Sequence, residues 1–284
     1  MTIDRPLVRR ELRDAVRRYW FLVNAGAFAV AGLLFVLFGD TGSMLVGSRG
    51  YARALAGLMQ LALVFVPLMA LVPSVVAIAG EREAGTLDYL LAQPLTRTRV
   101  FVDKWTGVGT AVVLSVLVGL GFTAVAAALK GVPGGRIAAL MGLTVLLALA
   151  FVSLGMWLSA LTTSRTKATS LGLTVWLLLV GLGSLGVMSA FVQWGVPAGA
   201  LEAWALVNPI EAYRLAAIAI LDPEAGVLGA VGQALLEALG VAGLVAASVA
   251  SLAAWSGAAF LLGRRAFSRP DRRGPGRTPA RSTT

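Results

Sequence analysis

The sequence predicts an all-α integral membrane protein with six transmembrane helices. Of its 284 residues, 58% are hydrophobic and only 13% are charged, and the mean hydropathy is +0.83. Soluble domains carry about 25% charged residues, so this composition is typical of a polytopic membrane protein. The apolar residues are also grouped into stretches of about 20, the length that an α-helix needs to cross the hydrocarbon core of a bilayer.

The N-terminal residues 1–18 predict a basic amphipathic helix that lies in the membrane interface. Arg pairs alternate there with apolar residues, so the helix has one charged side and one apolar side. A merely solubilising N-terminus is the alternative. At the other end, residues 263–284 are rich in Arg, Pro, Gly and Thr and predict a disordered basic cytoplasmic tail. The transmembrane domain therefore occupies residues 19–262.

Six stretches of the transmembrane domain are long and apolar enough to be membrane spans. They lie at residues 19–38, 55–80, 105–129, 137–161, 170–192 and 241–262. The segment between the fifth and sixth spans is of mixed polarity and contains three short helical patterns, at residues 201–207, 209–221 and 224–239. Because X-Pro pairs separate these patterns, we expect external helices before the last span.

The distribution of Lys and Arg predicts the orientation of the chain. If the N-terminus is cytoplasmic, 19 of the 24 Lys and Arg residues fall in cytoplasmic segments and 5 in external segments. An excess of this size is decisive under the positive-inside rule, so both termini are expected in the cytoplasm. The net charge of +10 is then a consequence of membrane topology rather than a sign of nucleic-acid binding.

The six spans contain no Asp, Glu, Lys or Arg. Charged residues at membrane depth usually mark ion pathways and proton relays, so their absence argues against an ion-driven carrier and against a pore for charged ions. The chain also has no Cys and no His. We therefore expect no zinc, haem or Cys/His-ligated copper site in this chain.

The sequence contains no pattern for catalysis. A phosphate-binding loop needs Gly-Lys-Ser/Thr, but the three lysines follow Asp103, Leu129 and Thr166. A nucleophile–base pair with His is excluded by the lack of His. We therefore expect a non-catalytic subunit that is driven by a partner.

Residues 81–104 form the one long polar interruption in the first two-thirds of the chain. They predict two short capped helices between the second and third spans. Thr86 is the expected N-cap of the first helix, and Asp88 lies in its first turn, where a negative charge suits the helix dipole. Pro94 ends this helix, and Thr96 is the expected N-cap of the second. A compact element of this kind is typical of a segment that docks onto something.

Residues 81–97 resemble the signature of the ABC-2 type transporter permeases, where it follows the second membrane helix. The residues that carry the resemblance are Glu81, Arg82, Glu83, Gly85, Thr86, Leu87, Asp88, Leu90, Leu91, Pro94 and Arg97. In that family the segment is a cytoplasmic coupling helix that fits a groove on a separate ATPase subunit. The resemblance implies two copies of that ATPase, which binds ATP and Mg, and no cofactor in this chain. It also implies a second permease copy, so that a homodimer is expected. The expected location is a prokaryotic cytoplasmic (inner) membrane.

The apolar and charged residues of this segment have different expected roles. Leu87, Leu90 and Leu91 share one helix face and would fill the groove on the ATPase, as anchor residues do at interfaces. The charged residues at positions 81, 82, 83 and 97 would orient the docking through charge pairs at its rim. The alternatives are that the leucines pack beneath the permease's own second and third spans, and that the charges are only solvated.

A second segment resembles permeases of copper-processing systems, which serve the maturation of nitrous oxide reductase outside the membrane. The residues that carry this resemblance are Asn208, Pro209, Glu211, Tyr213 and Arg214. We expect them at the outer mouth of the bundle, where they could gate it or contact an extracytoplasmic accessory protein. Structural capping of the bundle is an equally good interpretation.

The predicted function is that of the transmembrane permease subunit of an ATP-binding-cassette transporter. It would couple ATP hydrolysis in its partner either to export or to mechanical transmission across the membrane, and the second resemblance implies a role in copper-site maturation of nitrous oxide reductase. Export of a lipid-like or amphiphilic substrate is one alternative, because the spans are uncharged. A non-transporting membrane scaffold is the other.

Overall fold

The computed structural model describes residues 50–92, 95–129, 132–181, 197–221 and 228–269, together with seven residues between positions 26 and 34. Within these ranges all regular elements are helices. The predicted interfacial helix, most of the first span, the second half of the fifth span and the C-terminal tail beyond residue 269 lie outside the described residues.

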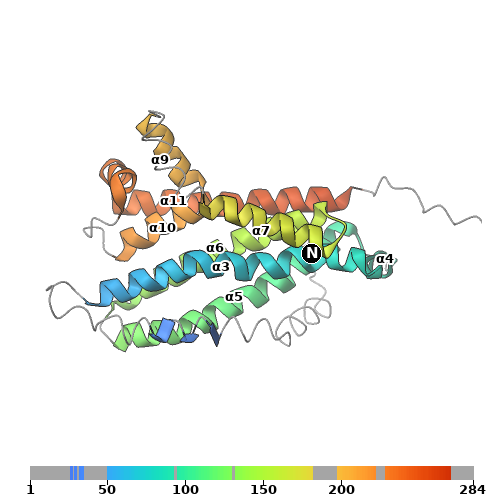
Figure 1. Ribbon diagram of the computed structural model, residues 1–284, viewed down its shortest axis with the longest axis horizontal. Helices are drawn as coiled ribbons and strands as arrows, with labels where there is room; N and C mark the ends of the chain where they lie inside the picture. The colour runs from blue at the N-terminus through green and yellow to red at the C-terminus, as the bar shows by residue number, and fades with distance from the viewer. Residues whose placement is uncertain are drawn as a thin grey trace, which may run out of the picture.

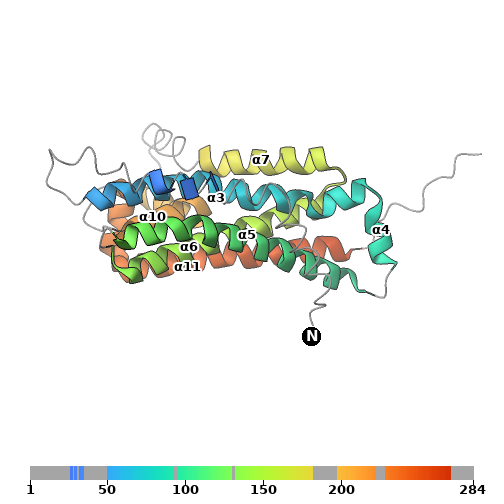
Figure 2. The ribbon, with the colours of Figure 1, turned by 90° about the horizontal axis from the view of Figure 1, so that it is seen from below.

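Eight helices make up the described part of the chain. They are α3 (Gly50–Glu83), α4 (Thr86–Leu91), α5 (Arg97–Leu129), α6 (Gly134–Leu161), α7 (Arg165–Gly181), α9 (Ala198–Val207), α10 (Pro209–Leu221) and α11 (Gly229–Ser268). The long helices α3, α5, α6 and α11 lie side by side along the molecule (Figure 1). Short α4 lies at one end of this bundle and α9 and α10 lie at the other, as the second view also shows for α4 and α10 (Figure 2).

Four of the described helices are long and apolar enough to cross a membrane: Ala62–Glu83, Arg97–Leu129, Gly134–Leu161 and Gly229–Ser268. They include the second, third, fourth and sixth predicted spans. A fifth crossing is formed if the bent pair Gly199–Val207 and Pro209–Leu221 is counted as one span. The all-helical, multi-pass prediction is therefore confirmed, while the count of six spans stays a prediction.

The α11 helix is broken at the boundary that the sequence indicated. Gly240 has φ 68° and ψ 172°, which separates a first segment ending at residue 239 from the long segment that follows. A positive φ is accessible to glycine at little cost, because glycine has no Cβ. The third short helical pattern and the sixth span are thus two parts of one bent element.

The α6 helix lies at the centre of the bundle, where it packs against α3, α5, α10 and α11. It contacts α3 most closely at Gly155, where an added Cβ would lie 2.6 Å from the Cβ of Ser74 and 3.1 Å from the carbonyl oxygen of Leu71. The α7 helix approaches α3 in the same way at Gly172, whose Cβ would lie 2.9 Å from Cγ1 of Val75. Small residues at such crossings let membrane helices pack with their backbones close together.

The α10 helix is a core element of the bundle. Its side chains are buried except at Arg214 and Ile220, which are half-buried, and it packs against α11, α6 and α3. It meets α9 at an angle of 95°. The helix carries apolar residues on all sides, which is typical of a buried helix. Its expected position on the external side of the membrane stays a prediction.

Candidate coupling site at the α4 end of the bundle

The turn between α3 and α4 depends on Gly85. This residue has φ 68°, which directs the chain away from α3 and begins α4 without a side-chain cap. Thr86 is therefore not the N-cap that we predicted. It is the first helical residue, and its hydroxyl donates to the carbonyl oxygen of Glu81 at 3.3 Å. Asp88 lies in the first turn of α4, as predicted, and is exposed.

The apolar residues of α4 face the bundle. Leu87 is only 4% exposed and belongs to the hydrophobic core, and Leu91 packs against that core. Leu90 is half-buried. The side chain that points outward is Tyr89, which is 79% exposed. The burial of Leu87 favours the alternative that the leucines pack beneath the permease's own spans, because a helix this short needs an anchor in the bundle to be stable. Docking through Leu90 and Leu91 stays a prediction.

The second predicted short helix is the beginning of α5. The helix runs without a break from Arg97 to Leu129, so the capped helical pair consists of one short helix and one long one. Thr96 caps α5 as predicted, because its hydroxyl oxygen accepts the backbone N–H of Arg99 at 3.3 Å. Arg97 is half-buried in the first turn. Pro94 lies outside the described residues.

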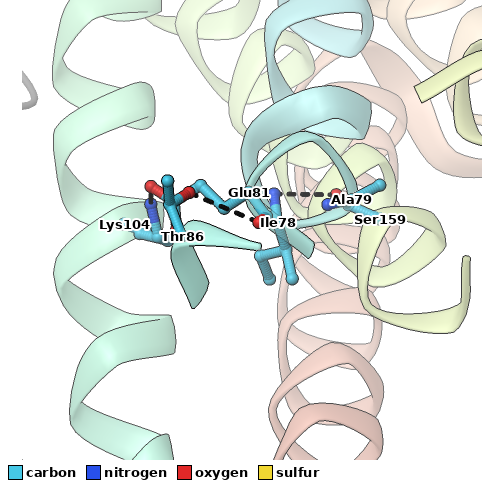
Figure 3. Close-up of polar contacts among 6 residues, drawn as sticks. All are labelled: Ile78, Ala79, Glu81, Thr86, Lys104 and Ser159. Atoms are coloured by element: carbon cyan, nitrogen blue, oxygen red, sulfur yellow. Dashed lines mark hydrogen bonds and ion pairs between the residues drawn. The ribbon is translucent and has the colours of Figure 1, made fainter. Parts of the chain in front are cut away.

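A buried ion pair closes the base of the segment that carries α4. The Nζ atom of Lys104 in α5 donates to Oε1 of Glu81 in α3 at 2.6 Å, and the Lys104 side chain is 2% exposed (Figure 3). Glu81 had been assigned to a docking rim, where its charge would face the partner. Its carboxylate instead joins the C-terminal turn of α3 to the second turn of α5.

The two residues that follow Glu81 contact two further helices. Arg82 donates from Nη1 to the carbonyl oxygens of Ala160 and Thr162, at 3.3 and 2.6 Å, and so binds the C-terminal end of α6. Glu83 accepts the backbone N–H of Arg165 at 2.8 Å, at the start of α7. Sequence reasoning offered only solvation or docking for these charges, and neither describes these internal contacts.

A side chain of α6 also forms hydrogen bonds with the backbone of α3. The hydroxyl oxygen of Ser159 accepts the backbone N–H groups of Ile78 and Ala79, at 3.0 and 2.9 Å (Figure 3). Both contacts are buried and lie one turn before Glu81. A side chain that enters the backbone ladder of another helix fixes the two helices at that point.

Aromatic packing fixes the start of α5 against the end of α11. The ring of Phe101 lies 5.7 Å from that of Phe260 and 6.1 Å from that of Phe267, measured between centroids. Trp105 meets Phe260 edge-on at 5.1 Å. The ends of α3, α5, α6, α7 and α11 are therefore connected to one another around α4.

The second predicted site lies at the opposite end, in α10. Asn208 is the N-cap of α10, since its Oδ1 accepts the backbone N–H of Ile210 at 3.0 Å, and its Nδ2 donates to the carbonyl oxygen of Leu179 in α7 at 2.9 Å. Pro209 is the first, buried residue of the helix. Asn208 therefore holds the α9–α10 corner on α7.

The remaining residues of this segment make contacts inside the bundle. Glu211 is buried and pairs with Arg214, with a closest approach of 2.6 Å. The Tyr213 hydroxyl is 3.0 Å from that of Thr144 in α6, and because Thr144 already donates to the carbonyl oxygen of Leu140, Tyr213 is the donor. Only Arg214 keeps substantial exposure. These contacts favour structural capping over a gate at the surface.

Comparisons with known proteins identify the family. Residues 5–272 match the family model described as ABC-2 family transporter protein. The chain belongs to the ABC-2 family. A relative from Pseudomonas aeruginosa, named probable ABC transporter permease protein NosY, is 31% identical over 278 residues, which are 95% of this chain and 99% of the relative. A protein of the same name from Stutzerimonas stutzeri is 32% identical over 233 residues, 79% of this chain and 84% of the relative.

Family membership confirms the resemblance that was drawn from residues 81–97. The ABC-2 chain is a multi-pass membrane permease subunit, and such subunits work with an ATPase subunit in ABC systems. The residues around α4 are therefore the candidate site for coupling to the ATPase. Sequence reasoning missed Tyr89 and Lys104 there; an aromatic residue between inward-facing leucines and a lysine at the start of a span are the signals that could have found them.

The ABC-2 chain also has a cavity of about 60 Å³ in the half of the bundle away from α4. Apolar residues of α3, α5, α6 and α10 line it, together with the hydroxyl-bearing residues Thr123, Thr144 and Tyr213. The Thr123 hydroxyl is buried and has no hydrogen-bond partner in the described part of the chain. Among the described residues no three of the metal-ligating types come together.

Proposed function

We propose that this ABC-2 permease receives its energy from a separate ATPase that docks on α4, and that two permease copies and two ATPase copies form the working complex. The observation that carries this proposal is the two-sided structure of α4: Leu87 holds it in the core while Tyr89 is 79% exposed. Tyrosine is among the residues that most often anchor interfaces. Asp88 is exposed beside it and would steer the docking through its charge.

The placement of basic residues supports a cytoplasmic position for α4. The described residues at this end of the bundle include nine cations, namely Arg82, Arg97, Arg99, Lys104, Arg165, Lys167, Arg264, Arg265 and Arg269. The opposite end carries Arg53, Arg136 and Arg214 in the described residues. Under the positive-inside rule, the α4 end faces the cytoplasm, where ATP is available to the partner.

In the proposed cycle, ATP binding closes the two ATPases and moves the two α4 helices. Because α4 lies between α3 and α5 in the chain and is anchored to the core, its movement reaches the membrane helices. The six predicted spans that would move contain no Asp, Glu, Lys or Arg. This cycle serves either export of an uncharged or amphiphilic substrate or the transmission of mechanical work to a protein on the other side.

The docking step is tested with Tyr89→Ala and Tyr89→Arg, measured by co-purification of the partner ATPase. We expect at least about a tenfold weaker recovery, as for a central interface residue. Leu161→Ala is the matched control, because Leu161 is 55% exposed at the same end of the bundle but lies outside α4. Unchanged recovery with both Tyr89 variants would contradict docking on this face of α4.

We further propose a role in copper-site maturation of nitrous oxide reductase, supported by the resemblance of residues 207–215 to copper-processing permeases. Copper itself would be handled by an extracytoplasmic partner, since this chain has neither Cys nor His. The test is to delete the gene and measure the copper content of the reductase. A fully copper-loaded reductase in the deletion strain would contradict this role and favour export of a lipid-like substrate.

A membrane scaffold without ATP coupling makes a different prediction. Inactivating the ATPase by substitution of its phosphate-binding lysine would then leave the phenotype of the strain unchanged. We expect instead that the ATPase variant has the same phenotype as deletion of the permease.

A further inference from the structure

Three consecutive charged residues at the end of α3 contact three different helices. Glu81 pairs with Lys104 in α5, Arg82 binds the carbonyl end of α6, and Glu83 accepts a backbone N–H of α7. The side chains of one helical turn point in different directions, so a single turn can reach all three neighbours. The last turn of α3 is thus the point at which these helices are joined.

Glu81 is connected to α4 as well as to α5. Its backbone carbonyl oxygen accepts the Thr86 hydroxyl at 3.3 Å, and its side chain binds Lys104 at 2.6 Å (Figure 3). A displacement of α4 therefore acts on Glu81 directly. The carboxylate passes that displacement to the second turn of α5.

The burial of Lys104 makes this connection strict. The Lys104 side chain is 2% exposed and that of Glu81 is 27% exposed, so separating the two would remove a charged partner from an ammonium group that has little access to water. The pair therefore favours joint movement of the start of α5 and the last turn of α3. Two apolar side chains of the same size in place of Glu81 and Lys104 would fill the space equally well. Apolar contacts are not directional, so α3 and α5 could then slide past each other.

We propose that the Glu81–Lys104 ion pair is the link that carries movement of α4 into α5, and that both residues act as positioning residues for coupling. This inference rests on the proposed docking of an ATPase on α4. It assigns to Lys104 a role that neither residues 81–97 nor the relatives' names suggest. The pair itself does not contact the partner, because Lys104 is buried within the permease.

The test uses the complete permease–ATPase complex reconstituted in lipid nanodiscs. The variants are Lys104→Met, Glu81→Met and the double variant, with Arg136→Met as the matched control. Arg136 is also a partly buried cation bound across helices, to the carbonyl oxygen of Leu221 at 3.1 Å, but it lies at the other end of the bundle. The measurements are ATPase recovery, the unfolding temperature of the permease and the increase in ATP turnover caused by the permease.

We expect the two single variants to recover the ATPase normally and to lose permease-dependent stimulation by about 5-fold or more, the lower end of measured coupling between sites. The double variant should lose no more than Lys104→Met alone, because two residues that act as one unit are not additive. If Glu81→Met lowers the unfolding temperature, the double variant supplies the test, since it removes both charges of the pair.

The outcomes separate this inference from the docking proposal. A wild-type permease that recovers no ATPase contradicts the docking proposal. With recovery intact, normal stimulation in Lys104→Met, or losses that multiply in the double variant, overturns the ion-pair link alone. Loss of recovery in parallel with loss of stimulation also overturns it, because the pair would then only support the docking surface.

Discussion

Substitution of Gly155 by alanine tests whether the α3–α6 crossing depends on the absence of a side chain. An added Cβ would lie 2.6 Å from the Cβ of Ser74, 3.1 Å from the carbonyl oxygen of Leu71 and 3.3 Å from the backbone nitrogen of Val75. Two of these three atoms belong to the backbone, so a rotamer change cannot remove the clash. The helices must separate by about 1 Å to restore ordinary carbon–carbon contact.

We expect Gly155→Ala to lower the free energy of unfolding by about 2–3 kcal/mol, the upper part of the range for an overpacked core site. The reason is that a 1 Å separation forfeits much of the dispersion attraction between α3 and α6 over the whole crossing. Gly142→Ala is the matched control in the same helix. Nothing lies within 4 Å of its added Cβ, so it should raise stability by about 0.5–1 kcal/mol through helix propensity.

The measurement is unfolding of the purified permease in mixed micelles, followed by circular dichroism. The decisive quantity is the difference in free energy of unfolding between Gly155→Ala and Gly142→Ala. Both variants add one methyl group to α6, so the difference removes any general effect of that addition. Equal stability of Gly155→Ala and Gly142→Ala would refute the close crossing. ATPase recovery with Gly155→Ala should also fall, because Ser159 and the α3 end lie one turn further along the same two helices.

Two further predictions concern hydroxyl groups and topology. Thr123→Val should raise the free energy of unfolding by about 1 kcal/mol, because it removes a buried hydroxyl that has no partner in the described part of the chain. Thr144→Val should lower the free energy of unfolding by about 1–3 kcal/mol, because the Tyr213 hydroxyl then loses its acceptor. Unfolding titrations in which both variants change the free energy with the same sign would contradict these contacts. The chain has no Cys, so Tyr89→Cys and Gly199→Cys provide single labelling sites on exposed residues at opposite ends. In intact cells an impermeant maleimide should label only Gly199→Cys, and labelling of Tyr89→Cys would reverse the orientation.

The parts of the fold that follow from local patterns could be predicted from the sequence. The apolar stretches 105–129 and 137–161 end where α5 and α6 end, because span length and the first polar residues are both local signals. The break at Gly240 was marked by a change from mixed to uniformly apolar sequence. Thr96 was identified as a cap because a cap involves only neighbouring residues.

The side chains at the candidate site could be predicted less well, because their partners are distant in the chain. The Arg82 guanidinium binds carbonyl groups about eighty residues away, and no local pattern indicates which carbonyls an arginine will reach. The position of α10 depends on the same kind of information. Asn208 was expected at the outer mouth of the bundle, and no local pattern indicated that its amide would bind the carbonyl oxygen of Leu179 in α7.

If the ATPase docks on α4 as proposed, the inward position of Leu87 and the outward position of Tyr89 would let a six-residue helix transmit force. Successive residues of an α-helix are rotated by about 100°, so these two side chains point in nearly opposite directions from the α4 axis. A load on Tyr89 is then opposed by Leu87 in the core and by Glu81 at the base of the segment. Because Glu81 pairs with Lys104 and accepts the Thr86 hydroxyl, the proposed link would make a helix too short to be stable alone an extension of α3 and α5.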